Sequence, residues 1–544
     1  MNTLQTDVVV VGAGPCGVTL ANYLGAYGVR AVLVERAADI LDYPRAVGVD
    51  DEALRSWQGV GLADTLLRDM LQNVPARYHN SRGRCFAEVA PEGQPFGWPR
   101  RNLFLQPLTE ATLRKGLDRY DCVRVELGLE ITGLASGERM VSLQGRRSDG
   151  EPIDIAARYV VGADGGRSTI RKLIGVELTG TTDTHKWLVI DVTDDTMDAP
   201  FTGIYCDPQR PSFSIHLPYG YRRLEFLLKP DETEEEVLKP ERLEALMRLH
   251  YGATGPLPPV KRSRIYLHHS RIAERFSVGR VFLAGDAAHL QPPFFGQGMN
   301  SGLRDATNLA WKLAWVLKGH ADEAILQTYD TERRHHALAM VKLATWMGSF
   351  YRPWNRLTES ARDLFFDVIR KLPGAKDYVL QLKFKPMSRY TQGVVLFDER
   401  AARRKDYPVG RMFMQPSVLV GDKVSRLDDV IGPGFCILGI HTDPAELLGR
   451  DTLEDLATIG CRTLWIRPSR SVGPGRQARS PSLEVEDVHG KFRDWKMRHP
   501  EWPFIVLRPD RYVAAVGSAA QLPETVRSLV TLLRAEAQAM RLAA

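Results

Sequence analysis

The chain opens with a pattern of apolar residues that is typical of a strand, a helix and a second strand. Residues 7–11 (DVVVV) form a β-branched run, which predicts a buried strand. A glycine-rich turn (GAGPCG, 12–17) follows, and residues 18–28 (VTLANYLGAYG) have helical spacing that ends at a glycine. Residues 30–36 (RAVLVER) predict the second strand. This order is a βαβ unit, which implies a parallel sheet with a right-handed crossover.

The pattern changes in the middle of the chain and again near residue 390. From about 174 to 267, runs such as KWLVIDV, SFSIHLP and RRLEFLL alternate in polarity, which predicts an antiparallel sheet with one solvated face. From Val281 a strand, a glycine loop and a long helix return, and helices are expected to about Lys385. A charged stretch then predicts a linker, and the remaining residues resemble a separate α/β unit.

Composition narrows the class of protein. The chain has 544 residues, more than one ordinary core, and its 72 Lys and Arg against 66 Asp and Glu give a net charge of +6. No basic block of the nucleic-acid-binding type is present, and no apolar run reaches the ~18 residues of a membrane span. Six scattered cysteines form no CxxC, so we expect reduced thiols, no metal site and a cytoplasmic protein without nucleic-acid or membrane partners.

The opening turn carries the chemistry of a dinucleotide site. Gly12, Gly14 and Gly17 form GxGxxG between a strand and a helix. Such glycines permit the tight turn, the approach of a pyrophosphate to the backbone, and close packing of helix on strand. Glu35 ends the second strand, where its carboxylate can accept the adenosine ribose hydroxyls. This motif alone does not separate NAD from FAD, so a plain NAD-dependent dehydrogenase is one alternative.

Two further strand ends carry an acid beside a glycine. Asp164 and Gly165 follow the strand ARYVVG, and Gly285 and Asp286 follow VFLA. Each aspartate on its own fits a helix N-cap equally well. Together with GxGxxG they resemble the single-component flavin-dependent aromatic hydroxylases, and this resemblance implies that all three segments bind FAD.

The resemblance implies a larger set of cofactor residues. In such a family the second motif lies near the pyrophosphate, and the third aspartate contacts the ribityl chain. The segments YPRAVGV and LQPLTEATL and the loop before the long helix would complete the site. Besides the residues named above, these segments supply Arg36, Arg45, Gln106, Pro293, Gly296, Gly298, Met299 and Asn300.

Segments such as GRCFAEV, CDPQRP, YLHHSRIAERF and RPDRYVAA resemble, more narrowly, the 3-(3-hydroxyphenyl)propionate and 3-hydroxycinnamate hydroxylases. The resemblance implies that NADH or NADPH reduces FAD, that O₂ forms a flavin C4a-hydroperoxide, and that a small phenolic acid is hydroxylated ortho to its OH. Another phenol, resorcinol-like or polyketide, is the alternative substrate. A non-hydroxylating flavoprotein built around the C-terminal unit is a third hypothesis. The oligomeric state stays open, with a homodimer as one candidate.

The substrate site is expected between the sheet and the loop 292–295. Pro292, Phe294 and Phe295 suit an apolar wall that excludes water, although a rigid loop with core aromatics explains them equally well. His289 is a candidate base for the phenol, with a structural hydrogen bond as its alternative. A propionate tail calls for an arginine, for which the candidates are Arg210, Arg222 and Arg223.

The resemblance also implies the fold class: α/β, with a Rossmann-like FAD-binding domain, an inserted antiparallel substrate sheet and a C-terminal thioredoxin-like domain. The expected boundaries are 1–175 and 276–390 for the FAD-binding domain, 176–275 for the substrate sheet, 391–412 for the linker and 413–544 for the last domain. Cys436 lies there without a CxxC, so we expect packing or subunit contact from this domain instead of redox chemistry.

Overall fold

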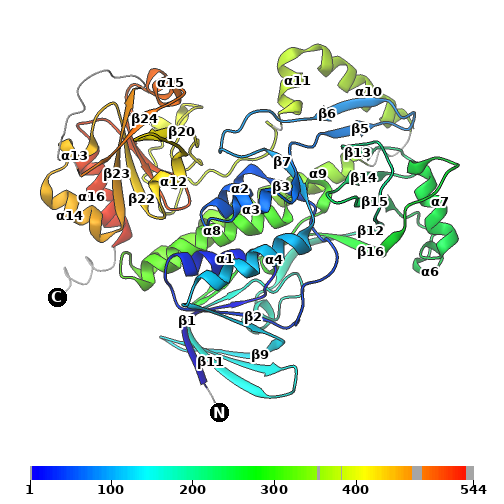
Figure 1. Cartoon of the computed structure of the whole chain (residues 1–544), viewed down its shortest axis with the longest axis horizontal. Helices are drawn as coiled ribbons and strands as arrows, with labels where there is room; N and C mark the ends of the chain where they lie inside the picture. Colours follow the sequence, from blue (N-terminus) through cyan, green and yellow to red (C-terminus); the bar gives the residue numbers. More distant parts are fainter. Residues whose placement is uncertain (1–2, 352–355, 382, 469–480, 535–544) are drawn as a thin grey trace.

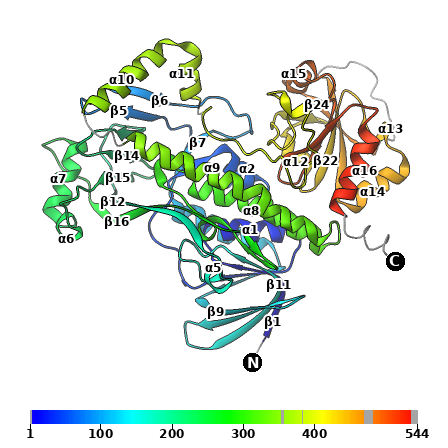
Figure 2. The same ribbon diagram turned by 180° about the vertical axis from the view of Figure 1, so that it is seen from behind.

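The computed structural model describes residues 3–351, 356–381, 383–468 and 481–534. Their strands form three large sheets and one small sheet (Figure 1). Figure 2 shows the same arrangement from behind, with the long helices α8 (Gly298–Leu317) and α9 (Thr328–Tyr351) crossing the centre. No helix in the described ranges is both long and apolar enough to cross a bilayer.

The first sheet brings the three glycine motifs to one edge. Its main order is β17-β18-β11-β1-β2-β8, and the neighbours from β18 to β8 run parallel. The carboxyl ends of β1, β11 and β18 therefore lie side by side, which places residues 12, 163 and 284 together. The strands are β1 (Thr3–Val11), β2 (Ala31–Glu35), β8 (Val123–Leu127), β9 (Leu129–Ser136), β10 (Val141–Arg147), β11 (Pro152–Gly162), β17 (Ser277–Val278) and β18 (Val281–Leu283).

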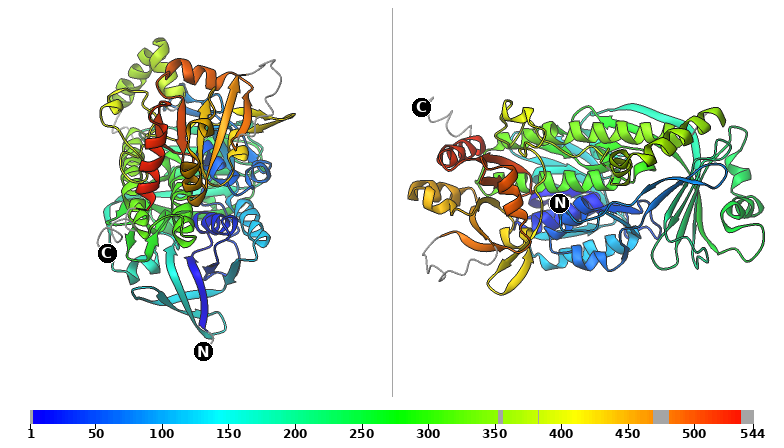
Figure 3. Two further views of the ribbon diagram at one scale, coloured as in Figure 1. Left: turned by 90° about the vertical axis from the view of Figure 1, so that its left-hand side faces the viewer. Right: turned by 90° about the horizontal axis from the view of Figure 1, so that it is seen from above.

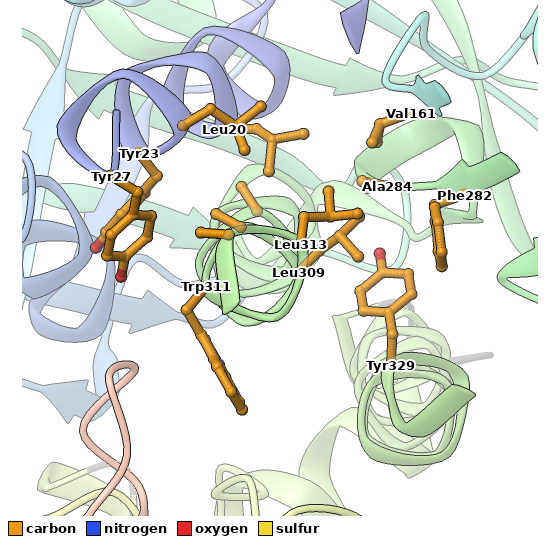
Figure 4. Packing of buried hydrophobic residues seen from close by; sticks show 14 of the residues in the cluster. Leu20, Tyr23, Tyr27, Val161, Phe282, Ala284, Leu309, Trp311, Leu313 and Tyr329 are labelled. Atoms are coloured by element: carbon orange, nitrogen blue, oxygen red, sulfur yellow. The ribbon is translucent and has the colours of Figure 1, made fainter. Parts of the chain in front are cut away.

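Helix α1 (Pro15–Ala26) is buried on nearly all sides, because α8 covers it from the other face. Figure 4 shows Tyr23 and Tyr27 of α1 on one side of α8, and Leu309 and Leu313 of α8 on the side toward Tyr329. A small sheet of β3, β7 and β4 lies beside these helices. The remaining elements of this region are β3 (Gly48–Asp50), β4 (Met70–Leu71), β7 (Arg101–Phe104), α2 (Asp51–Gln58), α3 (Ala63–Leu67), α4 (Gln106–Gly116) and α5 (Thr169–Leu173).

The second sheet has the order β19-β16-β12-β15-β14-β13-β5-β6. It is antiparallel from β19 to β13, as the alternating runs predict, but two strands from the first ninety residues extend it. Its strands are β5 (Ala76–His79), β6 (Cys85–Val89), β12 (Leu178–Val192), β13 (Thr202–Tyr205), β14 (Ser212–His216), β15 (Arg222–Leu227), β16 (Val260–Ala273) and β19 (His289–Leu290).

The expectation of one solvated face is wrong at the centre of this sheet. Five of the six residues of β15 are buried, because each face is covered by other parts of the chain. The charged insert forms α6 (Glu234–Val237) and α7 (Pro240–Tyr251), and α7 packs its apolar side on one face. Residues of the other face, among them Phe213, Ile215 and Glu225, line a cavity that is open to solvent on one side. Helices α10 (Arg356–Lys371) and α11 (Pro373–Leu380) cover β6 at the sheet end (Figure 1).

The C-terminal unit lies at the end opposite the second sheet, as the view from above shows (Figure 3). Its sheet has the order β21-β20-β24-β23-β22-β25-β26. A βαβ unit (β22 to β23) followed by a ββα unit (β25 to α16) is the thioredoxin-like arrangement that the resemblance implies. The elements are β20 (Ser417–Val420), β21 (Lys423–Arg426), α12 (Leu427–Ile431), β22 (Phe435–Ile440), α13 (Pro444–Leu447), α14 (Arg450–Thr458), β23 (Cys461–Pro468), β24 (Leu483–Asp487), α15 (Lys491–Arg498), β25 (Phe504–Leu507), β26 (Val513–Gly517) and α16 (Leu522–Leu533).

The cysteines of this unit are buried in its core. Burial raises the pKa of Cys436 to about 12, and it also raises the pKa of Cys461 well above the usual range. The thiolate is the reactive form of cysteine, so both side chains favour packing over redox chemistry.

Candidate functional site

The turn after β1 has the geometry that a bound pyrophosphate needs. Gly12 has φ +108°, and a Cβ there would lie 2.4 Å from the Ala163 carbonyl oxygen. A Cβ on Gly17 would lie 1.9 Å from the Gly12 oxygen, so only glycine lets α1 pack this closely. Gly14 differs, because its nearest neighbour would be the Arg45 guanidinium at 3.9 Å. Gly14 therefore has an open side in the cavity and is also the N-cap of α1, where free N–H groups favour an anion.

A cavity of about 830 Å³ begins at this turn and runs along the edge of the first sheet. Glu35 stands on its wall and accepts hydrogen bonds from the backbone N–H groups of Ala13 (2.8 Å) and Ala37 (3.0 Å). Four arginines line the same end: Arg36, Arg45, Arg114 and Arg167. Several positive charges close together suit the negative charge of a diphosphate. Of these arginines, Arg114 was not predicted from the sequence.

Gln106 positions the segment that carries Arg45. Its Oε1 accepts hydrogen bonds from the backbone N–H groups of Arg45 (3.2 Å) and Ala46 (2.7 Å). Its Nε2 donates to Glu110 (2.6 Å). No hydrogen bond or ion pair of the Arg45 guanidinium is described, so this cation is available to a ligand in the cavity.

Asp164 accepts hydrogen bonds at the start of a helix and also lines the cavity. Its carboxylate accepts hydrogen bonds from the N–H groups of Thr169 (2.7 Å) and Ile170 (3.1 Å), which caps α5. Ser168 also donates to it at 2.5 Å. Asp164 and Gly165 nevertheless both line the cavity.

The segment 285–305 forms the far side of the same cavity. Gly285 has φ +60°, and Asp286 extends into the cavity without a described hydrogen bond. Asp286 is exposed to the cavity, and desolvation by the surrounding walls raises the pKa of this carboxyl, whereas His289 and Arg45 act in the opposite direction. An unpaired acceptor in this position fits a hydroxyl-bearing chain such as ribityl.

His289 lies outside the walls of the cavity. It is 1% exposed, and its Nε2 is 2.7 Å from Asp305, which also accepts from the Gly285 N–H (3.0 Å) and from Arg333 (2.8 Å). The strand β19 turns the histidine toward this buried carboxylate. The Asp305–Arg333 pair, which sequence reasoning missed, supports the Gly285–Asp286 turn from behind.

Helix α8 points its N-terminus at the cavity. Gly296, Gly298, Met299 and Asn300 all line the cavity, and Gly296 adopts φ +60° just before the helix. Asn300 donates to the carbonyl oxygens of Gly296 (2.7 Å) and Gly48 (3.2 Å), which joins the loop to β3. The first N–H groups of a helix have no intrahelical acceptor, so they can stabilise negative charge on a ligand.

The second half of the cavity is lined by apolar side chains from the second sheet. They are Ala76, Tyr78, Val89, Ile204, Phe213 and Ile215, joined by Phe294 and Met387. Phe294 is also a core aromatic, because its ring lies 5.5 Å from Trp187 and 4.9 Å from His268. Pro293 lines the cavity, Pro292 is buried and does not line it, and the side chain of Phe295 lies outside the described part of the chain.

Of the three arginines considered as partners for the carboxylate tail of the substrate, one lines the cavity and two do not. Arg210 pairs with Glu232 (2.6 Å), and Arg222 is fully buried against Asp195 (2.6 Å), so neither lines the cavity. Arg223 does line it. Its guanidinium donates twice to Asp191 and once each to the carbonyls of Arg45 and Pro44, which leaves one of its five N–H groups.

A charged corner at the start of α2 completes the cavity and was not anticipated from the sequence. Asp50, Asp51, Glu52, Arg100 and Lys385 all line it. Arg304 of α8 donates to Asp50 (2.5 Å) and Glu52 (2.7 Å), and Lys385 donates to the same two carboxylates (2.8 and 3.4 Å). No consecutive motif marks this corner, since its cations come from three separate places: the residue before β7, helix α8 and the segment after α11.

These walls fit FAD. Gly14, the unpaired Arg45 and the unpaired Asp286 all line this one cavity, and their chemistry suits a pyrophosphate and a ribityl chain. The N-terminus of α8 lines the same cavity and could stabilise negative charge on a flavin ring. A nicotinamide dinucleotide bound by GxGxxG alone would leave Asp286 and the α8 terminus without a role.

Two parts of the chain match known protein families. Residues 5–344 match the family model described as FAD binding domain, and residues 410–532 match the HcaD C-terminal domain. The chain is 48% identical over 524 residues to a 3-(3-hydroxy-phenyl)propionate/3-hydroxycinnamic acid hydroxylase of Burkholderia cenocepacia (strain HI2424), covering 95% of both chains. It is 41% identical over 539 residues to the enzyme of that name from Mycobacterium avium (strain 104), covering 97% of this chain and 92% of the relative.

Among solved structures, the fold resembles the flavin-dependent monooxygenase PieE in complex with FAD and substrate. The TM-score is 0.81 at 21% identity, over 97% of this chain and 99% of the other. This likeness includes the C-terminal unit, so the relative supports the architecture as a whole.

Proposed function

The chain belongs to the FAD-dependent aromatic hydroxylases, and we propose from that premise that it hydroxylates 3-(3-hydroxyphenyl)propionate and 3-hydroxycinnamate ortho to the ring hydroxyl. The product is the 2,3-dihydroxy acid, as in the breakdown of aromatic compounds. The observation that carries the proposal is one continuous cavity with a cationic dinucleotide end and an apolar aromatic end.

The cofactor supplies two kinds of chemistry when bound: it takes a hydride from NADH or NADPH and it activates O₂. The protein's own residues bind and orient it. In our proposal Glu35 holds the adenosine ribose, Arg45 and the α1 N-terminus hold the pyrophosphate, and Asp286 holds the ribityl chain. Residues 1–175 and 276–390 would form this FAD-binding part, with 176–275 and β5–β6 closing the substrate end.

The substrate's ring fits the apolar end, where Phe213, Ile215 and Phe294 exclude water. Exclusion of water matters because activated oxygen would otherwise be released without product. Arg223 is the one tail candidate on the wall, and its remaining N–H is the group we assign to the propionate carboxylate. The neighbouring Asp191 offsets its charge, so we expect the tail to contribute more to orientation than to affinity.

The test is consumption of NADH and of NADPH by the FAD-loaded protein with a panel of phenolic acids under ¹⁸O₂. We expect 3-(3-hydroxyphenyl)propionate to accelerate NAD(P)H oxidation and to gain one labelled oxygen. A panel extended to resorcinol and polyketide phenols decides the substrate class. NAD(P)H oxidation without any labelled product would support the non-hydroxylating flavoprotein instead.

A further inference from the structure

One carboxyl on the cavity wall has no described partner although its two neighbours in sequence are both paired. Asp51 is the first residue of α2, is 6% exposed and lines the cavity. Within the described ranges no hydrogen bond or ion pair reaches its carboxylate, whereas Asp50 and Glu52 each bind Arg304 and Lys385. Arg304 and Lys385 are therefore already engaged, and Arg100, the third cation of this corner, donates to Gln381.

The surroundings of Asp51 favour its protonated form. Burial raises the pKa of this carboxyl to about 7; the negative charges of Asp50 and Glu52 act in the same direction, and Lys385 and Arg100 oppose them. Arg304 faces the two neighbours and has no described bond to Asp51. A carboxyl that changes protonation near neutral pH is suited to proton exchange with a ligand.

The location of Asp51 matches the place where the reaction requires a base. The N–H of the preceding residue, Asp50, donates to Asn300 (3.3 Å), and Asn300 also binds Gly48 and Gly296. The start of α2 is thus tied to the loop before α8, where the flavin ring would lie. In ortho hydroxylation the ring hydroxyl is on the carbon next to the one attacked, so its proton must leave from this same end of the cavity.

We propose that Asp51 accepts the proton of the substrate's ring hydroxyl, a role that rests on the hydroxylase function proposed above. The O–H bond of the phenol breaks, the proton moves to a carboxylate oxygen of Asp51, and the electron pair stays on the phenolate oxygen. The ring becomes more electron-rich and attacks oxygen more readily. The proton returns to water through the open side of the cavity after turnover.

A second cavity carboxyl provides a matched comparison. Glu225 on β15 also lacks a described hydrogen bond, and burial raises its pKa as well. It stands on the wall formed by the second sheet, beside Arg223. A base on that wall would face the tail end of the substrate. Glu225 therefore tests whether a buried cavity carboxyl must also lie at the start of α2 in order to accept the proton of the ring hydroxyl.

The first experiment measures proton release during binding, without turnover. The FAD-loaded oxidised protein is titrated calorimetrically with 3-(3-hydroxyphenyl)propionate at pH 7 in buffers of different ionisation enthalpy. A carboxyl with a pKa near 7 is about half protonated, and a hydrogen bond from the phenol favours its ionised form, so we expect release of up to about half a proton. Asp51→Asn should release none, and 3-methoxyphenylpropionate, which lacks the hydroxyl hydrogen, should cause no release from the wild type.

The second experiment is the pH dependence of kcat/KM. For the wild type, kcat/KM should rise as the pH increases through about 7. For Asp51→Asn this rise should be absent, and kcat/KM should fall by about 10²- to 10⁴-fold, the usual contribution of general base catalysis. A ring-fluorinated substrate with a more acidic hydroxyl should recover part of that loss. Asp51→Glu should keep the rise with pH, and so should Glu225→Gln even if its KM changes.

The outcomes separate the two proposals. Asp51 is not the base if the Asp51→Asn variant releases protons on binding and its kcat/KM rises with pH as that of the wild type does. The same conclusion follows if kcat/KM of Glu225→Gln no longer rises through about pH 7. If the wild type binds the phenolic acids but hydroxylates none of them, the hydroxylase function fails, and the calorimetry still decides whether Asp51 exchanges a proton. If no phenolic acid binds, both proposals are overturned.

Discussion

Replacement of Arg508 by methionine should be one of the most damaging single changes to the stability of this protein. Arg508 follows β25 in the C-terminal unit and has no exposed side-chain surface. It donates two hydrogen bonds to Glu332 of α9 (2.8 and 2.7 Å) and two to Asp510 (2.9 and 2.6 Å). Lys312 of α8 donates to the same Glu332 (2.8 Å), so this cluster joins the C-terminal unit to the two central helices.

The expected loss in the free energy of unfolding follows from the charges of this cluster. In the native cluster the positive charges of Arg508 and Lys312 balance the negative charges of two carboxylates. These are Glu332 and Asp510, and all four side chains are essentially unexposed. Arg508→Met preserves much of the side-chain volume but leaves one negative charge in excess. Removing one partner of a buried ion pair typically costs about 3–5 kcal/mol, because the remaining charge has lost both water and its partner.

The assay is urea unfolding of the FAD-loaded protein, followed by circular dichroism and by flavin fluorescence in the same samples. The matched control is Arg404→Met, which removes an arginine of the same unit that pairs with Asp406 and Glu501 at an exposed position. An exposed pair contributes little, so this variant should unfold almost as the wild type does. If Arg508→Met unfolds at the same urea concentration as Arg404→Met, the reasoning from buried charge is refuted.

Three further predictions concern the cofactor site and its charged corner. Asp286→Ala should weaken retention of FAD with the fold intact, measured by flavin release on dilution and by circular dichroism; an unchanged affinity would refute the assigned ribityl contact. Gly17→Ala should reduce both stability and FAD content, because the added Cβ would meet the Gly12 oxygen at 1.9 Å, and full loading at wild-type stability would contradict this. Asp51→Asn should be more stable than the wild type at pH 8, by up to about 4 kcal/mol, and should lose this advantage near pH 4. The reason is that the pKa of Asp51 is raised to about 7 in the folded state, so ionisation of Asp51 destabilises the wild type increasingly as the pH rises from about 4 to 7. Thermal unfolding at both pH values measures the difference.

Much of the candidate cofactor site could be predicted, since most of its residues lie in short segments that directly follow a strand or begin a helix. The geometry at Gly12, Gly17 and Gly285 depends on local backbone conformation and close packing, which glycine spacing after a strand already indicates. The parallel order of β1, β11 and β18 then brings the segments together. Of the cofactor residues expected from the sequence, all except the packing glycine Gly17 line the cavity.

The substrate end was less predictable because its walls come from distant parts of the chain. The strands β5 and β6 precede the predicted substrate region by about a hundred residues, yet they extend its sheet. His289 lies close to Asp286 in sequence, but β19 turns it toward Asp305 and away from the cavity. Sequence spacing cannot reveal which side of a short strand faces a ligand when both sides are buried.

The sequence by itself determined the local conformations, the order of the elements and the family, because these depend on residue type and spacing. The tertiary structure decided which charges are neutralised. Asp50, Asp51 and Glu52 are three consecutive acids, and their order alone does not distinguish them. The packing of Arg304 and Lys385 pairs two of them and leaves Asp51 buried and unpaired on the cavity wall, because burial and the distance to a cation are properties of the fold.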